Sequence, residues 1–378
     1  MHHLKKPFLE KLSQRQKEGN YRNLIQPENL IDFYSNDYLG FSRDTELQNT
    51  ISLEIAQQAG LSNLQIHGAT GSRLISGNSA YAQDLEFKIA QFHEAEAALL
   101  FNSGYSANLG LLSAIGIKEV TFLYDELCHA SLLDGMRLGY AKRYKYKHQD
   151  LCDLERLLKL QTGTVFIITE SVFSMDGDTS PLIEIVNLCK KYEAQIIVDE
   201  AHSLGIFGNH GKGLVDELNL TSEIFACIFT YGKALGSHGA AITGSNDLIN
   251  YLINFSRPFI YTTALSIAQL ASIKCGYEKL MSYDYPKILK PRNTIFAERL
   301  THLAFTYTPS KSCIHSLIIG NKIIAKKIAQ KLTQSGIHAK AILAPTVATN
   351  TERIRLCYHL FNTAQETEEL LLTLQQIS

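Results

Sequence analysis

The chain has 378 residues, of which 45% are hydrophobic, and this length suits a large domain with a smaller companion better than one ordinary core. Its 36 lysines and arginines nearly balance 37 aspartates and glutamates, which leaves a net charge of −1. This balance excludes the basic field that nucleic acid or an anionic membrane requires, so small molecules and a second copy of the chain are the expected partners.

The first twelve residues contain basic side chains but lack the apolar core of a secretory signal. We draw no functional conclusion from His2 and His3. No later apolar run reaches the roughly 18 residues that a membrane span needs. The seven cysteines lie far apart, with no C-x-x-C pair and no histidine at zinc spacing. We therefore expect a cytoplasmic protein with reduced, mostly buried thiols and no metal site.

From about Asn78 to Gly244, short apolar runs alternate with amphipathic stretches, which is typical of a mostly parallel sheet with helices on both faces. A helical pattern from Tyr81 to Phe92 precedes the first of these runs. Five runs are predicted to be strands: Ala97 to Phe101, Val120 to Tyr124, Val165 to Thr169, Ile196 to Val198 and Ile224 to Thr230. The predicted fold class of this part is α/β.

Polar residues follow several of these strands: Asp125, Glu170, Asp199 and Lys233. In parallel α/β sheets, ligands bind outside the carboxyl ends of the strands. The sequence therefore predicts the functional site at this edge of the sheet.

After Ser266 a helical pattern runs to about Ser282, and a smaller alternation of strands and a helix follows. Its predicted elements are a strand from His315 to Ile319, a helix from Asn321 to Ser335, and strands from His338 to Leu343 and from Arg353 to Tyr358. We expect an N-terminal arm (1–40), a large domain (41–265) and a small C-terminal α/β domain (266–378).

The strongest local signal is Lys233 in Thr230-Tyr-Gly-Lys-Ala-Leu-Gly-Ser237, a glycine-rich turn directly after an apolar strand. Glycines on both sides of the lysine allow a planar ligand to approach the backbone. Taken alone, the pattern fits a surface lysine in a turn equally well. The second signal is Asp199, which ends the strand of Ile196-Ile-Val-Asp-Glu-Ala-His202 and would be costly to bury unpaired. Alone, it is more often a helix cap or a salt-bridge partner.

Together, Lys233 and Asp199 indicate pyridoxal phosphate, because the pyridine ring needs a carboxylate beside its nitrogen and its aldehyde forms an imine with a lysine. Burial lowers the pKa of a lysine and frees its amine for this bond. The phosphate fits Asn102-Ser-Gly-Tyr105, which enters a helix expected to begin near Ala107, since backbone N–H groups at a helix start bind anions. Thr230 adds a hydroxyl.

Two further residues are candidates with commoner alternatives. His129 follows the strand that ends near Tyr124 and could stack on a planar ring, although a histidine there is more often a helix cap. Ser174 follows the Val165 strand and could contact the ring substituents, but Asp176-Gly177 is itself a turn signal.

As a set, these residues lie in motifs that resemble the α-oxoamine synthases, fold-type I enzymes that depend on pyridoxal phosphate. The similarity spans nearly the whole chain. The motifs are Ser35 to Gly40, His67 to Gly77, Phe101 to Asn108, His129 to Leu133, Val172 to Asp178, Val198 to His202, Thr230 to Gly236 and Pro345 to Val347.

The resemblance implies the imine at Lys233, ring-nitrogen contact by Asp199, ring stacking by His129 and contacts to the ring oxygen from Ser174 and His202. It assigns the phosphate to Gly104, Tyr105 and Thr230. It implies that Arg22, His129, Thr346 and Arg355 contact substrate, with Arg355 a better candidate than Arg353 for the amino-acid carboxylate, because the planar guanidinium pairs with a carboxylate in two bonds. Lys233, His129 and Asp199 are the implied catalytic residues.

Family members condense an amino acid with an acyl thioester and release carbon dioxide. The stretches Gly236 to Ala241 and Phe259 to Thr263 are similar to the alanine-using branch, which implies L-alanine and a pimeloyl thioester of coenzyme A or acyl carrier protein, giving 8-amino-7-oxononanoate for biotin. A glycine-using synthase, an aminotransferase and a non-catalytic subunit are the alternatives. The resemblance also implies a homodimer in which Thr262 and Thr263 reach the partner's phosphate.

Overall fold

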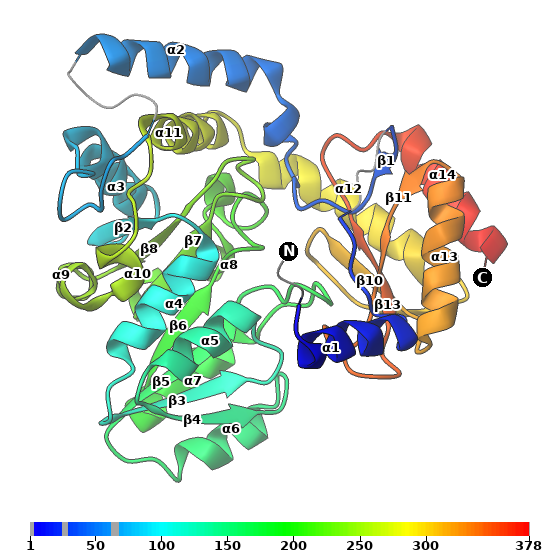
Figure 1. Cartoon of the computed structure of the whole chain (residues 1–378), viewed down its shortest axis with the longest axis horizontal. Coiled ribbons are helices and arrows are strands. Elements are labelled where there is room, and N and C mark those ends of the chain that lie inside the picture. The colour runs from blue at the N-terminus through cyan, green and yellow to red at the C-terminus, as the bar shows by residue number, and fades with distance from the viewer. Residues whose placement is uncertain (1–3, 25–28, 62–67, 378) are drawn as a thin grey trace.

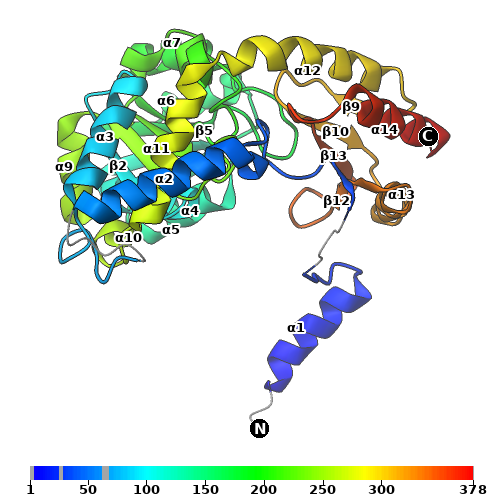
Figure 2. The same cartoon turned by 90° about the horizontal axis from the view of Figure 1, so that it is seen from above.

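The computed structural model describes residues 4–24, 29–61 and 68–377 (Figure 1). A large and a small lobe lie side by side, and helix α12 (Tyr285–Thr301) runs from one to the other (Figures 1 and 2). This arrangement matches the predicted large domain with a smaller companion.

The large lobe is built on a seven-stranded sheet with strand order β2-β8-β7-β6-β5-β3-β4. Its strands are β2 (Ala97–Phe101), β3 (Val120–Asp125), β4 (Lys142–Tyr146), β5 (Thr164–Glu170), β6 (Gln195–Asp199), β7 (Ala226–Thr230) and β8 (Ala240–Gly244). Strand β8 is antiparallel to both of its neighbours, while the other pairs are parallel. The expected α/β fold with a mostly parallel sheet is confirmed.

Alternate residues of each central strand enter two separate apolar cores, one on each face of the sheet. In β6, Ile196 and Val198 belong to one core and Ile197 to the other, as the two-residue period of a strand requires. One face is covered by α4 (Gly104–Ile115), α5 (Ala130–Leu138), α9 (Asn246–Phe255) and α10 (Arg257–Ile260). The other is covered by α3 (Ala80–Phe92), α6 (Leu151–Leu158), α7 (Leu182–Tyr192), α8 (Leu214–Glu217) and α11 (Ile267–Ser282).

The small lobe contains a four-stranded antiparallel sheet with strand order β12-β13-β10-β9. These strands are β9 (Thr306–Thr308), β10 (Ile314–Ile318), β12 (Lys340–Ile342) and β13 (Arg353–Cys357), packed with α13 (Lys322–Gln334) and α14 (Ala364–Ile377). Strand β1 (Ile31–Asp32) pairs with β11 (Ile337–His338). The chain before the large lobe is thereby attached to the small one.

Helix α2 (Thr45–Leu61) lies along α11 on the outside of the large lobe (Figure 1). Three short 3-10 turns, η1 (Phe41–Arg43), η2 (Asn209–Gly211) and η3 (Thr221–Glu223), complete the helical elements of the described residues.

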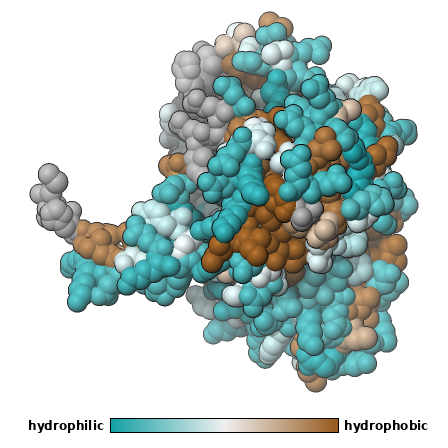
Figure 3. Space-filling view, turned by 90° about the vertical axis from the view of Figure 1, so that its right-hand side faces the viewer, coloured by the Kyte–Doolittle hydropathy of each residue, from teal (hydrophilic) through white to brown (hydrophobic). Residues whose placement is uncertain are grey.

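Helix α1 (Lys6–Lys17) projects from the side of the small lobe (Figures 2 and 3). Its apolar side chains, Leu9 and Leu12 among them, are exposed. Beyond its end, the Lys322 ammonium donates to the Glu18 carbonyl at 3.0 Å. Figure 3 shows the small lobe face-on, with an apolar area among hydrophilic side chains.

The seven cysteines form no disulfide; Cys152 on α6 is exposed and the other six are buried, as predicted for reduced thiols. Among the described residues, no helix combines the length and the apolar character that crossing a membrane requires.

Several elements differ from the sequence predictions: the predicted strand from His338 to Leu343 is divided into β11 and β12, which belong to different sheets, and α12 and β9 were not predicted. Strand β4 was missed because its residues, Lys142–Tyr146, are charged and largely exposed at the edge of the sheet. Strand β8 was missed because it directly follows the glycine-rich turn and its sequence, Ala-Ala-Ile-Thr-Gly, contains a single large apolar residue. Helix α4 begins at Gly104 rather than near Ala107, because the Ser103 hydroxyl caps it by accepting from the Ser106 amide at 3.1 Å.

Candidate active site

A cavity lies at the predicted edge of the sheet, and all the predicted cofactor contacts except Ser174 line it. These are Gly104, Tyr105, His129, Asp199, His202, Thr230 and Lys233. They lie at the carboxyl ends of β2, β3, β6 and β7 or just after them. Because these strands are parallel, their ends bring residues that are distant in sequence to one place.

Lys233 lies in a tight turn between β7 and β8. The turn is closed by the Ser237 amide, which donates to the Tyr231 carbonyl at 2.8 Å, and by the Gly236 amide, which donates to the Lys233 carbonyl at 2.9 Å. Gly236 has φ +57°, and a Cβ there would lie 2.2 Å from the Ser42 amide nitrogen. Burial lowers the pKa of Lys233 to about 8, although Asp199 and Glu170 act to raise it. The amine is therefore unusually available as a nucleophile.

Asp199 is buried at the end of β6 and is fixed by two donors. The Asn108 side-chain amide donates to Oδ2 at 2.8 Å, and the Ala201 amide donates to Oδ1 at 3.0 Å. The Asn108 Nδ2 also lies 2.9 Å from Ser131 Oγ. Asp199 is thus held rigidly beside the cavity, as a group that must contact one ring atom requires.

His129 caps the start of α5, so the commoner alternative considered for it is also realised. Its Nδ1 lies 2.7 Å from Ser131 Oγ, and its backbone amide donates to the Glu170 carboxyl group. Burial lowers the pKa of His129, although the nearby Asp199 charge acts to raise it. Burial and Asp199 raise the pKa of Glu170 well above its usual range. A neutral ring and a protonated carboxyl are therefore favoured here.

His202 connects the cavity with the small lobe. Its Nδ1 lies 2.7 Å from the Tyr38 hydroxyl, which donates to Asn36 Oδ1 at 3.2 Å. The same Asn36 oxygen accepts from Arg355 Nη2 at 2.9 Å. Burial, followed by the charge of Lys233, lowers the pKa of His202 well below its usual range.

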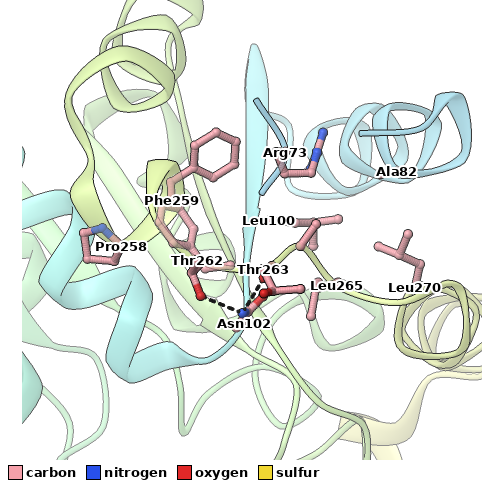
Figure 4. A pocket seen from close by; sticks show the side chains of 12 residues that line it. Arg73, Ala82, Leu100, Asn102, Pro258, Phe259, Thr262, Thr263, Leu265 and Leu270 are labelled. Carbon is pink, nitrogen blue, oxygen red and sulfur yellow. Dashed lines mark hydrogen bonds between the residues drawn. The ribbon is translucent and has the colours of Figure 1, made fainter. Parts of the chain in front are cut away.

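Gly104 stands at the start of α4, where the phosphate was predicted. A Cβ at Gly104 would lie 2.3 Å from Thr230 Cγ2, so the close approach of α4 to β7 requires glycine. The Tyr105 hydroxyl donates to Asp134 on α5. Next to this point, Asn102 donates to Thr262 Oγ1 at 3.3 Å and to the Thr263 carbonyl at 2.8 Å (Figure 4).

Ser174 lies in the loop after β5, outside the set of residues that line the cavity. Its backbone carbonyl accepts from Arg355 Nε at 2.7 Å. The neighbouring Arg353 forms an ion pair with Asp176. Since Arg353 is already paired with a carboxylate, this geometry favours Arg355 as the arginine for a substrate carboxylate.

Arg22 and Thr346 line a different groove, between the N-terminal segment and β12. Tyr34 and Lys340 lie in the same groove, and the Lys340 ammonium donates to the Tyr34 hydroxyl at 3.2 Å. Lys340 stands opposite Arg355 in the pairing of β12 with β13. This groove therefore lies one strand away from the residue predicted to bind the amino acid. His67, the first residue of one quoted motif, lies outside the described residues.

The residues fit pyridoxal phosphate. Asn108 Oδ1 is buried and has no partner among the described residues, so it leaves an acceptor free beside Asp199. Asn108 and Glu170 are additional cavity residues that were not assigned roles from the sequence. Glu170 could have been found from its place at a strand end, whereas Asn108 lies inside a helix, where only packing shows which way a side chain points.

A family model for class I and II aminotransferases matches residues 28–374. An 8-amino-7-oxononanoate synthase from Emericella nidulans is 39% identical over 372 residues, which cover 93% of this chain and 90% of that protein. Among solved structures, 8-amino-7-oxononanoate synthase from Francisella tularensis is 29% identical with a TM-score of 0.77, covering 92% and 98% of the two chains. Serine palmitoyltransferase from S. paucimobilis has a TM-score of 0.90 at 23% identity, covering 98% and 96%, and shows the shared fold.

Proposed function

The chain belongs to the class I and II aminotransferase family, in the group of the 8-amino-7-oxononanoate synthases, which are pyridoxal-phosphate-dependent acyltransferases, and from that premise we propose its reaction. It condenses L-alanine with a pimeloyl thioester, forming 8-amino-7-oxononanoate and releasing carbon dioxide and the carrier thiol, as a step of biotin biosynthesis. The observation that carries this proposal is the placement of Lys233 and Asp199 in one cavity, with Arg355 reaching it through Asn36.

The proposed cofactor residues are Lys233 for the aldehyde, Asp199 for the ring nitrogen, His129 for the ring face, Ser174 and His202 for the ring oxygen, and Gly104, Tyr105 and Thr230 for the phosphate. When bound, the cofactor supplies an aldehyde that condenses with amines and a protonated ring that draws electrons from the substrate α-carbon.

Lys233 performs the proton transfer in this proposal. With its pKa lowered to about 8 by burial, a useful fraction of Nζ is uncharged near neutral pH and can take the proton from the α-carbon of alanine. Asp199, held by Asn108 and the Ala201 amide, is fixed beside the cavity where the ring nitrogen is proposed to lie. Arg355 binds the carboxylate of alanine, since its guanidinium offers two parallel donors.

A thioester-consumption assay tests the substrates. Alanine, glycine and serine are each combined with pimeloyl, succinyl, acetyl and palmitoyl donors, carried by coenzyme A and by acyl carrier protein, with Lys233→Ala as the inactive control. We expect alanine with a pimeloyl donor to be preferred. Preference for glycine with a succinyl or acetyl donor would assign the chain to a glycine-using synthase, and no activity with any pair would favour the non-catalytic alternative.

We also propose that the enzyme is a homodimer with the site close to the interface. Thr262 and Thr263, which are proposed to reach the phosphate site of the second copy, are held by Asn102 next to the start of α4 (Figure 4). Arg22 and Thr346 are proposed to contact the acyl donor, because they line one groove near the Arg355 strand.

A further inference from the structure

The loop Val172–Thr179 of the large lobe contacts the small lobe at several points. From the small lobe, the Ser310 and Ser312 hydroxyls each donate to the Gly177 carbonyl at 2.8 Å, and the Ser316 hydroxyl donates to the Met175 carbonyl at 2.5 Å. Arg353 pairs with Asp176, and Arg355 donates to the Ser174 carbonyl. The loop therefore supplies the acceptor for Nε of Arg355, while Asn36 and Cys357 contact its two Nη atoms.

On the other side, His148 fastens the same loop to the large lobe. Its Nδ1 lies 2.9 Å from Oδ1 of Asp125, which is buried at the end of β3, and its Nε2 lies 2.7 Å from Oδ2 of Asp178. The Phe173 ring packs edge-on against the imidazole, with the ring centroids 4.5 Å apart. Burial acts to lower the pKa of His148, but the two carboxylates raise it to about 10. Both ring nitrogens then carry protons and donate.

We propose that His148 is a positioning residue for the amino-acid substrate: as a cation between Asp125 and Asp178, it holds the loop whose Ser174 carbonyl orients Arg355. The inference rests on the proposed role of Arg355. Without the cation, Asp178 keeps a hydrogen bond from the Gln149 side-chain amide, but its charge repels that of Asp176, which pairs with Arg353. Repulsion then displaces the loop, and Arg355 loses the acceptor that fixes its Nε.

The test measures amino-acid binding without any thioester, by titrating the holoenzyme with L-alanine and following its visible absorption. His148→Gln removes the charge and one donor, and we expect the apparent Kd for alanine to rise about tenfold, the size typical of a lost hydrogen bond to a charged group. His148→Arg restores the cation and two donors, so it should recover most of the affinity. His302→Gln, the same change at an exposed histidine, should bind alanine as the wild type does.

A double-mutant cycle with Arg355→Gln separates positioning from a general structural role. If His148 acts through Arg355, His148→Gln should weaken alanine binding by less than about twofold once Arg355 is replaced. Asp178→Ala removes the loop-side partner of His148 together with its charge, so it frees the loop from β3 without adding repulsion. It should weaken alanine binding in the same direction by a smaller factor, which keeps the inference testable if His148→Gln fails to fold.

Unchanged alanine affinity in a folded His148→Gln or Asp178→Ala enzyme would overturn the inference, as would an equal loss in the Arg355→Gln background. A wild-type holoenzyme that responds to none of alanine, glycine and serine would instead overturn the proposed function, and this inference with it. The two failures are therefore distinguishable.

Discussion

Lys233 should make the protein less stable than it would be without a lysine at this position, and Lys233→Met isolates the effect in protein freed of its cofactor. The residue is half-buried in a turn, and burial lowers the pKa of its amine from 10.5 to about 8. A lysine whose pKa falls on folding opposes folding wherever it must be protonated. Replacing it with an apolar side chain of similar length should therefore raise the free energy of unfolding at neutral pH.

The size of the effect follows from the two pKa values. Each tenfold loss of proton affinity is worth about 1.4 kcal/mol, so lowering the pKa from 10.5 to about 8 costs about 3 kcal/mol at pH 7. This destabilisation by Lys233 is complete below pH 8, falls to about 2 kcal/mol at pH 9 and is under about 1 kcal/mol at pH 10. It disappears above the pKa of the lysine in the unfolded chain. Partial exposure of the residue makes these figures upper values.

Urea unfolding of both proteins at pH 7, 9 and 10 measures this dependence. Lys274→Met is a control of opposite sign, because hydrogen bonds to Glu54 and Glu278 raise the pKa of Lys274 against the effect of burial. Lys274 therefore stabilises the fold below about pH 10.5, and its removal should lower the free energy of unfolding at pH 7. A Lys233→Met protein that is no more stable than the wild type at pH 7, or a stability gain that stays constant to pH 10, would refute the reasoning.

Three further changes test the cavity. Asn108→Leu removes the donor to Asp199 Oδ2 and should weaken cofactor binding about tenfold or more by equilibrium dialysis, whereas Asn254→Leu on the exposed face of α9 should not. Gly104→Ala forces a Cβ to 2.3 Å from Thr230 Cγ2 and should lower the free energy of unfolding in urea by about 1–3 kcal/mol. Adding Thr230→Ser to this variant deletes the Thr230 methyl group and should restore most of the lost stability. A double mutant as unstable as Gly104→Ala would contradict the close contact. Asp199→Asn removes a charge that raises the pKa of Lys233, so the midpoint for reaction of Lys233 with an amine reagent should fall below pH 8, and an unchanged or higher midpoint would contradict this electrostatic assignment.

Sequence patterns located the site because its residues follow strands. Asp199, Lys233 and His129 come directly after apolar runs, and parallel strands end at one edge, so the cavity could be predicted without coordinates. The same reasoning could not find Asn108, since a residue inside a helix faces the site or solvent according to the packing of that helix. The roles assigned to these residues, and the domain boundaries at residues 40 and 265, stay predictions.

The contacts between the lobes could not be predicted either. Ser310, Ser312 and Ser316 act through hydroxyls on backbone carbonyls of the loop Val172–Thr179, and such contacts leave no pattern in composition or spacing. Strand β4 shows the other limit, because an exposed edge strand of lysines, arginine and tyrosines lacks the apolar run that marks a buried one.

Cys152 gives this protein a built-in labelling site. It is the only exposed thiol among the seven, and it lies in the first turn of α6, four residues after His148. Because thiol reagents react with accessible sulfur, a fluorophore or spin label should attach at this one position without removal of the buried cysteines. A label attached to Cys152 should therefore report on the surroundings of His148 and its contact with the loop Val172–Thr179.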